Sequence, residues 1–132
     1  MLCHADPMGD ELDGRRVLVT GGTSGIGEAT ARAVLAEGAS VALVARSADA
    51  VMDLADRLGE RAHGVPCDVT DPESIGRAVQ AAVDALGGID VVVCSAGVFR
   101  PGGIESTTPA DWRAMFEVNV LGVLHTVKAA LP

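Results

Sequence analysis

Short apolar runs alternate with longer helical patterns along this chain of 132 residues, and the alternation constrains the fold more than any other feature. Runs this short and this rich in valine are typical of strands that a parallel sheet buries on both faces. Strands joined by helices form right-handed crossovers, which predicts an α/β fold with a doubly wound parallel sheet. The four runs lie at residues 15–20, 40–45, 62–67 and 89–94.

Helical patterns fill the intervals between these runs and carry their own start and stop signals. Ser47, Asp71 and Thr108 are predicted N-caps, because their side-chain oxygens can accept hydrogen bonds from backbone N–H groups of the first turn. The first three helices end on glycine, which readily adopts the left-handed conformation found after a helix. The predicted helices cover residues 26–38, 47–59, 71–88 and 108–131.

The first strand runs into a glycine-rich turn with the spacing G-x-x-x-G-x-G, formed by Gly21, Gly25 and Gly27. These glycines permit a tight turn, a close approach of the backbone to a ligand, and close packing of the next helix on the sheet. The hydroxyls of Thr23 and Ser24 add hydrogen-bond donors at the helix N-terminus, where the dipole favours an anion. The turn therefore predicts a pyrophosphate site, with a ligand-free strand-to-helix turn as the alternative.

The charge balance argues against several classes of partner. A net charge of −8 disfavours nucleic acid, because clustered Lys and Arg supply most of the affinity for phosphate backbones. No apolar run approaches the roughly 20 residues of a membrane span, and the leader "MLCHADPMGDELDG" lacks the regions of a secretion signal. We therefore expect a cytoplasmic protein with no nucleic-acid or membrane partner.

The three cysteines show neither a disulfide framework nor a metal-binding pattern. Cys3, Cys67 and Cys94 are odd in number and lack both C-x-x-C spacing and a histidine at ligand distance. We interpret them as buried free thiols and predict no metal site.

Four ordered motifs within residues 14–132 resemble those of the short-chain dehydrogenases/reductases. They are "TGGTSGIG" at 20–27, "CDVT" at 67–70, "CSAG" at 94–97 and "NVLG" at 119–122. The resemblance implies a Rossmann-type, NAD(P)-dependent oxidoreductase that moves a hydride between nicotinamide and an alcohol or ketone.

The resemblance also implies roles for individual residues. Asp68 and Val69 contact the adenine, and Asn119 is the asparagine of the catalytic tetrad that helps to hold a water in a proton relay. The alternative for Asp68 is that its carboxylate only stabilises a turn or caps a helix. Ser95 stands where the family usually has asparagine. An amide inside an apolar helix is costly unless satisfied, which favours a special role for Asn119. The predicted cofactor-binding residues are Gly21, Thr23, Ser24, Gly25, Ile26, Gly27, Arg46, Asp68, Val69, Ser95, Ala96 and Gly97.

The end of the second strand indicates which dinucleotide is preferred. Relatives that use NAD place an acidic residue there to bind the ribose 2′-hydroxyl. This chain has Ala45 followed by Arg46, whose planar guanidinium suits a 2′-phosphate. We therefore predict NADP as the cofactor rather than NAD, with an ordinary surface arginine as the alternative.

Two parts of the family's catalytic machinery are absent from the sequence. The family uses a serine on a fifth strand and a Tyr-x-x-x-Lys helix whose tyrosine transfers the proton. The chain has no tyrosine, and its only lysine is Lys128. His125 is interpreted as a surface or packing residue. We thus expect a tail at 1–13 and an NAD(P)-binding domain at 14–132, truncated before the catalytic Ser and Tyr-x-x-x-Lys segment and inactive alone.

Three interpretations of the whole remain open. The chain is a partial oxidoreductase, a non-catalytic NADP-binding or regulatory module, or an interaction protein that joins a full-length relative through its sheet edge or last helix. The family's strand order, 3-2-1-4, would leave the apolar fourth strand at an edge, which natural proteins usually cover. The resemblance implies an alcohol or ketone substrate and a homo-oligomer for the complete protein, and it leaves the individual substrate unnamed.

Overall fold

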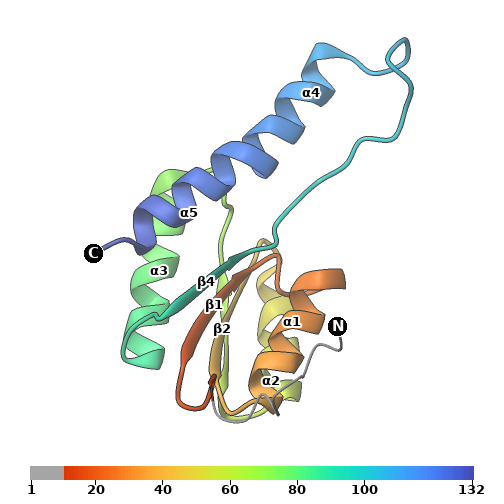
Figure 1. The fold of residues 1–132 in the computed structure, drawn as a ribbon. Helices are drawn as coiled ribbons and strands as arrows, with labels where there is room; N and C mark the ends of the chain where they lie inside the picture. Colours follow the sequence, from red (N-terminus) through yellow and green to blue (C-terminus); the bar gives the residue numbers. More distant parts are fainter. Residues whose placement is uncertain (1–10) are drawn as a thin grey trace, which may run out of the picture.

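The computed structural model describes residues 11–132, whose strands form one parallel sheet in the order β3-β2-β1-β4 (Figure 1). The predicted fold class and strand order are confirmed; Cys3 and most of the predicted tail lie outside the described residues. The elements are β1 (Arg16–Thr20), α1 (Gly25–Ala36), β2 (Ser40–Ala45), α2 (Ala48–Leu58), β3 (Ala62–Pro66), α3 (Pro72–Leu86), β4 (Val91–Cys94), α4 (Pro109–Phe116), η1 (Glu117–Leu121) and α5 (Gly122–Ala130).

Helices cover both faces of the sheet. Figure 1 shows α1 and α2 on one side, and α3 and α5 on the other. Successive side chains of a strand point to opposite faces, so Val17 and Val19 of β1 pack in the cluster with α1 and α2, whereas Leu18 packs in the cluster with α3. All three are essentially inaccessible to solvent. Burial on both faces explains why the strands read as continuous apolar runs.

The predicted helix starts are confirmed by their cap geometry. Ser47 accepts a hydrogen bond from the backbone N–H of Ala50, at 3.3 Å between Oγ and N. The carboxylate of Asp71 accepts from the N–H of Glu73, at 2.9 Å. Thr108 forms a reciprocal capping box with Asp111 at the start of α4. These contacts are local in sequence, which is why the pattern of residue types predicts them.

The last predicted helix has the expected extent but not the expected regularity. Elements α4, η1 and α5 follow one another from Pro109 to Ala130, and the middle one is a turn of π-helix. There the N–H of Gly122 donates to the carbonyl of Glu117, five residues earlier. Asn119 lies inside this wide turn, a type of helix distortion that is frequent at functional sites.

A bidentate ion pair joins β1 to the start of β4. Nη2 of Arg16 lies 2.7 Å from Oδ1 of Asp90, and Nε lies 2.9 Å from Oδ2. The same guanidinium donates to the carbonyl of Gly87 at 2.7 Å, at the end of α3. The hydrogen bonds from Arg16 hold the pKa of the Asp90 carboxyl well below its usual range. Arg16 therefore fixes β4 at the side of β1.

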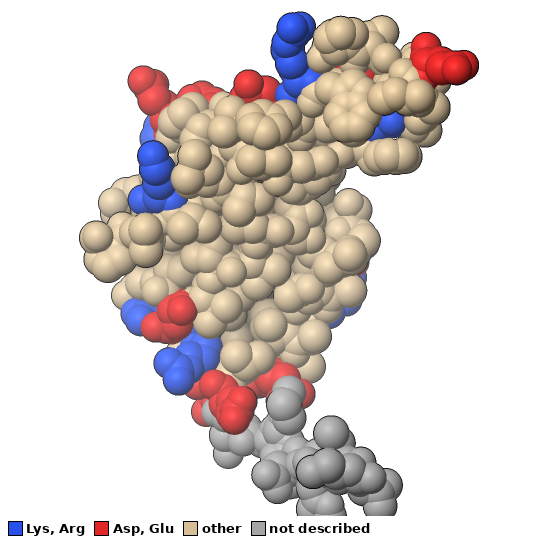
Figure 2. Space-filling view, turned by 45° about the horizontal axis from the view of Figure 1, so that its top comes forward, with Lys and Arg blue, Asp and Glu red and all other residues tan. Residues whose placement is uncertain are grey.

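Charged side chains are unevenly distributed over the surface. Figure 2 shows a broad area without charged side chains across the middle of one face, with Lys, Arg, Asp and Glu gathered toward its two ends. Within residues 11–132, no helix combines the length and apolar character that crossing a membrane requires.

Candidate functional site

A cleft of about 540 Å³ opens at the carboxyl ends of the strands. Parallel strands place their carboxyl ends at one edge of the sheet, so segments far apart in sequence meet there. The turn after β1, the end of β2 and the segments after β3 and β4 all contribute to its walls. Val118, at the start of the π turn, also lines the cleft and is apolar.

Most of the predicted cofactor-binding residues line this cleft. Those that do not are Gly25, Ile26, Gly27 and Ser95, and the side chain of Ile26 is 78% exposed. The lining residues from the prediction are Gly21, Thr23, Ser24, Arg46, Asp68, Val69, Ala96 and Gly97.

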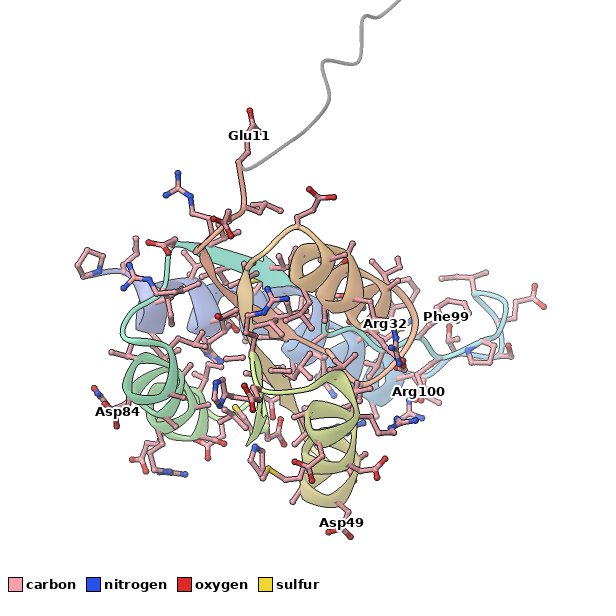
Figure 3. All side chains as sticks on the ribbon, turned by 90° about the horizontal axis from the view of Figure 1, so that it is seen from below. Glu11, Arg32, Asp49, Asp84, Phe99 and Arg100 are labelled. Carbon is pink, nitrogen blue, oxygen red and sulfur yellow. The ribbon has the colours of Figure 1, made fainter. Side chains whose placement is uncertain are left out.

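Val98 and Val118 also line the cleft, although no motif pointed to them. Val98 follows the "CSAG" stretch and Val118 precedes Asn119. Both are apolar neighbours of predicted residues, and only the folded arrangement turns them into the cleft. Beyond Val98 the chain leaves the cleft: Figure 3 shows Phe99 and Arg100 on the side of the molecule where Arg32 also lies, away from Asp84.

Close backbone approach requires two glycines of the turn, and a positive φ favours the third. Gly21 has φ +65°, and a Cβ built on it would lie 2.7 Å from Cα of Ala96, in the segment after β4. A Cβ on Gly27 would collide with the carbonyl oxygen of Gly21. Gly25 has φ +52° with open space where a Cβ would be. The turn after β1 therefore packs without side chains against the neighbouring segment and the first turn of α1.

The N-terminus of α1 presents unpaired donors next to the cleft. Ser24 is the N-cap residue, but its side chain makes no capping hydrogen bond. The first N–H groups of a helix have no intrahelical partner, and the helix dipole adds partial positive charge there. With the hydroxyls of Thr23 and Ser24 beside them, these groups fit the phosphates of a dinucleotide.

A cation and a carboxylate lie at another part of the same cleft. Asp68 accepts hydrogen bonds from the N–H and the hydroxyl of Thr70, at 3.0 and 2.8 Å. These bonds, with a smaller effect of the Arg46 charge, lower the pKa of Asp68. Asp71, rather than Asp68, caps α3. Arg46 is exposed and makes no ion pair among residues 11–132, so its guanidinium has no competing carboxylate in direct contact.

Asn119 binds the backbone of the segment after β4. Its Oδ1 accepts from the N–H of Val98 at 2.8 Å, and its Nδ2 donates to the carbonyl of Val98 at 2.9 Å. Both ends of the amide are thus hydrogen-bonded, as expected for an amide inside a helix, although the side chain is exposed rather than buried. Asn119 itself does not line the cleft.

The described cysteines differ in burial. Cys67 is buried at the cleft, and its burial raises the pKa of the thiol. Cys94 is only half-buried, so the prediction of a buried thiol is wrong at this position. It lies on β4, which pairs with a strand on one side only. Among residues 11–132, no group of three His, Cys, Asp or Glu side chains is placed to hold a metal ion.

Residues 15–132 match the short chain dehydrogenase family, and the chain belongs to that family. Uncharacterized oxidoreductases of Staphylococcus are similar to it. The one from Staphylococcus haemolyticus is 38% identical over 123 residues, which are 92% of this chain and 53% of the relative. One from Staphylococcus epidermidis is 39% identical over 115 residues, covering 87% and 50%. The chain thus spans about half the length of these relatives.

Solved structures of short-chain dehydrogenases share the fold. A short chain dehydrogenase from Burkholderia cenocepacia, in complex with NADP, superposes with a TM-score of 0.82 at 38% identity, over 90% of this chain and 50% of that one. A 3-ketoacyl-(acyl-carrier-protein) reductase from Brucella melitensis, complexed with NADH, gives a TM-score of 0.87 at 31% identity, over 92% and 50%. The two neighbours therefore hold different nicotinamide dinucleotides.

Proposed function

We propose that this chain is the cofactor-binding part of an NADP-dependent oxidoreductase that acts on an alcohol or ketone. The observation that carries the proposal is that Gly21 of the turn, the N-cap residue Ser24 of α1 and the cation of Arg46 line one cleft, beside the first N–H groups of that helix. Bound nicotinamide would supply the hydride chemistry. The residues of this chain bind and orient the dinucleotide.

The residues at the end of β2 favour NADP. Ala45 stands where NAD-using relatives carry a carboxylate, and the cation of Arg46 follows it directly. Since solved neighbours hold either NADH or NADP, family membership alone does not choose between the two. Within residues 11–132 the guanidinium of Arg46 has no direct ionic partner, so its donors are available for a 2′-phosphate.

Replacement of Arg46 tests this preference. We expect Arg46→Ala to weaken NADP binding about tenfold to a hundredfold, because a charge-assisted contact is lost, and to leave NAD binding unchanged. The measurement is the dissociation constant of each dinucleotide by calorimetry. Arg57→Ala, on the outside of α2, is the matched control and should change neither value. Equal affinities for both cofactors in the parent chain, or an equal loss of both in Arg46→Ala, contradict the assignment.

We propose that the chain alone binds the dinucleotide but does not catalyse hydride transfer. Asn119 is the one tetrad residue that the motifs identify, and no tyrosine is present to transfer the proton. Loss of a general acid typically removes about 10²–10⁴-fold in rate. We expect no NADPH oxidation with a panel of ketones and aldehydes, followed by absorbance on folded protein. Turnover that Asn119→Ala abolishes would show that these residues already form a working site.

Further properties of the whole protein are part of the same proposal. We propose that it resides in the cytoplasm, takes a small alcohol or ketone, and assembles as a homo-oligomer. A sedimentation measurement on the protein as expressed tests the last of these.

A further inference from the structure

One face of α5 contacts the segment after β3. His125 is partly buried, and its Nδ1 lies 3.1 Å from the carbonyl oxygen of Val69. A carbonyl oxygen only accepts hydrogen bonds, so the imidazole must carry its proton on Nδ1 to make this contact. The contact fixes the ring orientation and the tautomer together.

Gly122 contacts the same valine one helical turn earlier. It is buried, and a Cβ built on it would lie 2.8 Å from Cγ2 of Val69. Residues three apart lie on one side of a helix, so Gly122 and His125 form one surface against Val69. The side chain of Val69 packs on the bare backbone at Gly122, while its carbonyl accepts from His125. Val69 is therefore held at two points from the same helix.

The preceding turn of the same helical path contacts another part of the cleft lining. Asn119, three residues before Gly122, binds the N–H and carbonyl of Val98. Val69 and Val98 come from the segments after β3 and β4, which are not adjacent strands, and both line the cleft. Three residues spaced three apart along the helical path thus contact two segments that line the cleft. They are Asn119, Gly122 and His125.

We propose that His125 is a positioning residue: through its contact with the Val69 carbonyl, and with Gly122 behind the Val69 side chain, it fixes the wall of the cleft that receives the adenosine part of the cofactor. The inference rests on the proposed function for the identity of the ligand. The positioning itself concerns only this chain and is tested without ligand.

Two variants separate the hydrogen bond from the bulk of the side chain. His125→Leu keeps an apolar volume but removes the donor. His125→Asn places an amide nitrogen near the position of Nδ1 and retains a donor. Lys128→Ala, exposed on the same helix, is the control.

The first measurement is NMR on the ligand-free chain. We expect the imidazole ¹⁵N shifts to show a proton on Nδ1 of neutral His125. Amide hydrogen exchange at residues 69–71 should be about threefold to tenfold faster in His125→Leu, the factor that one hydrogen bond typically supplies. It should return toward the parent rate in His125→Asn and be unchanged in Lys128→Ala. A proton on Nε2, or faster exchange spread equally over the sheet, overturns the proposal.

The second measurement uses adenosine 2′,5′-bisphosphate and inorganic pyrophosphate as probes. His125→Leu should weaken the adenosine probe about threefold to tenfold, while pyrophosphate, which would occupy the glycine turn, binds as before. An equal loss for both probes overturns the positioning role. Absence of adenosine-probe binding in the parent chain overturns the proposed function instead, and the exchange measurement then decides on His125 alone.

Discussion

Two regions of the described chain are buried to very different degrees. We call β1 and β2 with the turn and helix end next to them the enclosed half, and β4 with the segment and helical path that follow it the open half. In β1 and β2, Leu18 and Leu43 have no exposed surface, and their neighbours along both strands are equally enclosed. In β4, Val91 is 37% exposed, and the helical path that follows leaves Trp112 and Leu124 about half exposed. The proposed phosphate and 2′-phosphate contacts lie on the enclosed half, whereas Asn119 lies on the open one. The turn proposed to bind phosphate is thus better supported by the chain's own packing than Asn119, the residue assigned to catalysis.

Truncation of one leucine in each half gives the largest expected contrast. Leu43→Ala should lower the free energy of unfolding by about 2–5 kcal/mol, because it leaves a cavity between the sheet and its helices. Leu124→Ala, at a site 45% exposed, should cost about 0.5 kcal/mol or less. Urea denaturation measures both losses, provided that the dependence of the unfolding free energy on urea concentration is the same in each variant. Similar losses would show that the open half is as tightly packed as the enclosed one.

Two glycines test how tightly the turn after β1 packs against the segment after β4. Gly21 and Gly87 both have positive φ, but only Gly21 has backbone atoms where a Cβ would be. Gly87→Ala should cost about 1–2 kcal/mol for the left-handed conformation. Gly21→Ala should cost a further 1–3 kcal/mol or so, because the turn is pushed away from Ala96. Thermal unfolding compares the two, and an equal loss would mean that the turn moves freely relative to β4.

The Arg16–Asp90 pair should give the smallest effect, visible as a pH dependence. The folded-state pKa of Asp90 lies below its ordinary value of 3.8, so its contribution to stability is present above that pH and is lost as the pH falls below it. Asp90→Asn should therefore reduce the loss of stability between pH 7 and pH 3. Urea midpoints over this range provide the test, with Asp56→Asn on α2 as control. An unchanged pH profile would show that the pair does not support β4.

The elements that the sequence predicted best are those with local causes. The caps at Ser47 and Asp71 need only residues within three positions, and the strands need only their own apolar character. The strand order and the cleft at the carboxyl ends followed from the family's topology. Arg46 was identified because its position after the second strand is itself a sequence signal.

The contacts that the sequence could not supply join residues far apart along the chain. Arg16 and Asp90 are 74 positions apart, and His125 and Val69 are 56 apart. The sequence indicated that the Asn119 amide needs hydrogen-bond partners, but it did not indicate that the backbone of Val98 supplies them. The π turn was missed because it arises where the helix packs on two separate segments, and no propensity of its residues marks it.

The π turn has a consequence for chain length. A turn bonded over five residues contains one residue more than a regular α-helical turn, as if that residue had been inserted. Deleting Val120 would remove the extra residue and let the turn close with ordinary α-helical bonds, so that later side chains would keep nearly the same direction around the axis. Deleting a residue from the regular helix that follows, such as Val123, would instead turn His125 by about 100° away from the carbonyl that it now contacts. Insertions between residues 99 and 108, beyond the part of that segment that lines the cleft, leave the phase of the helix untouched, so length variation should be tolerated there and excluded between Gly122 and His125.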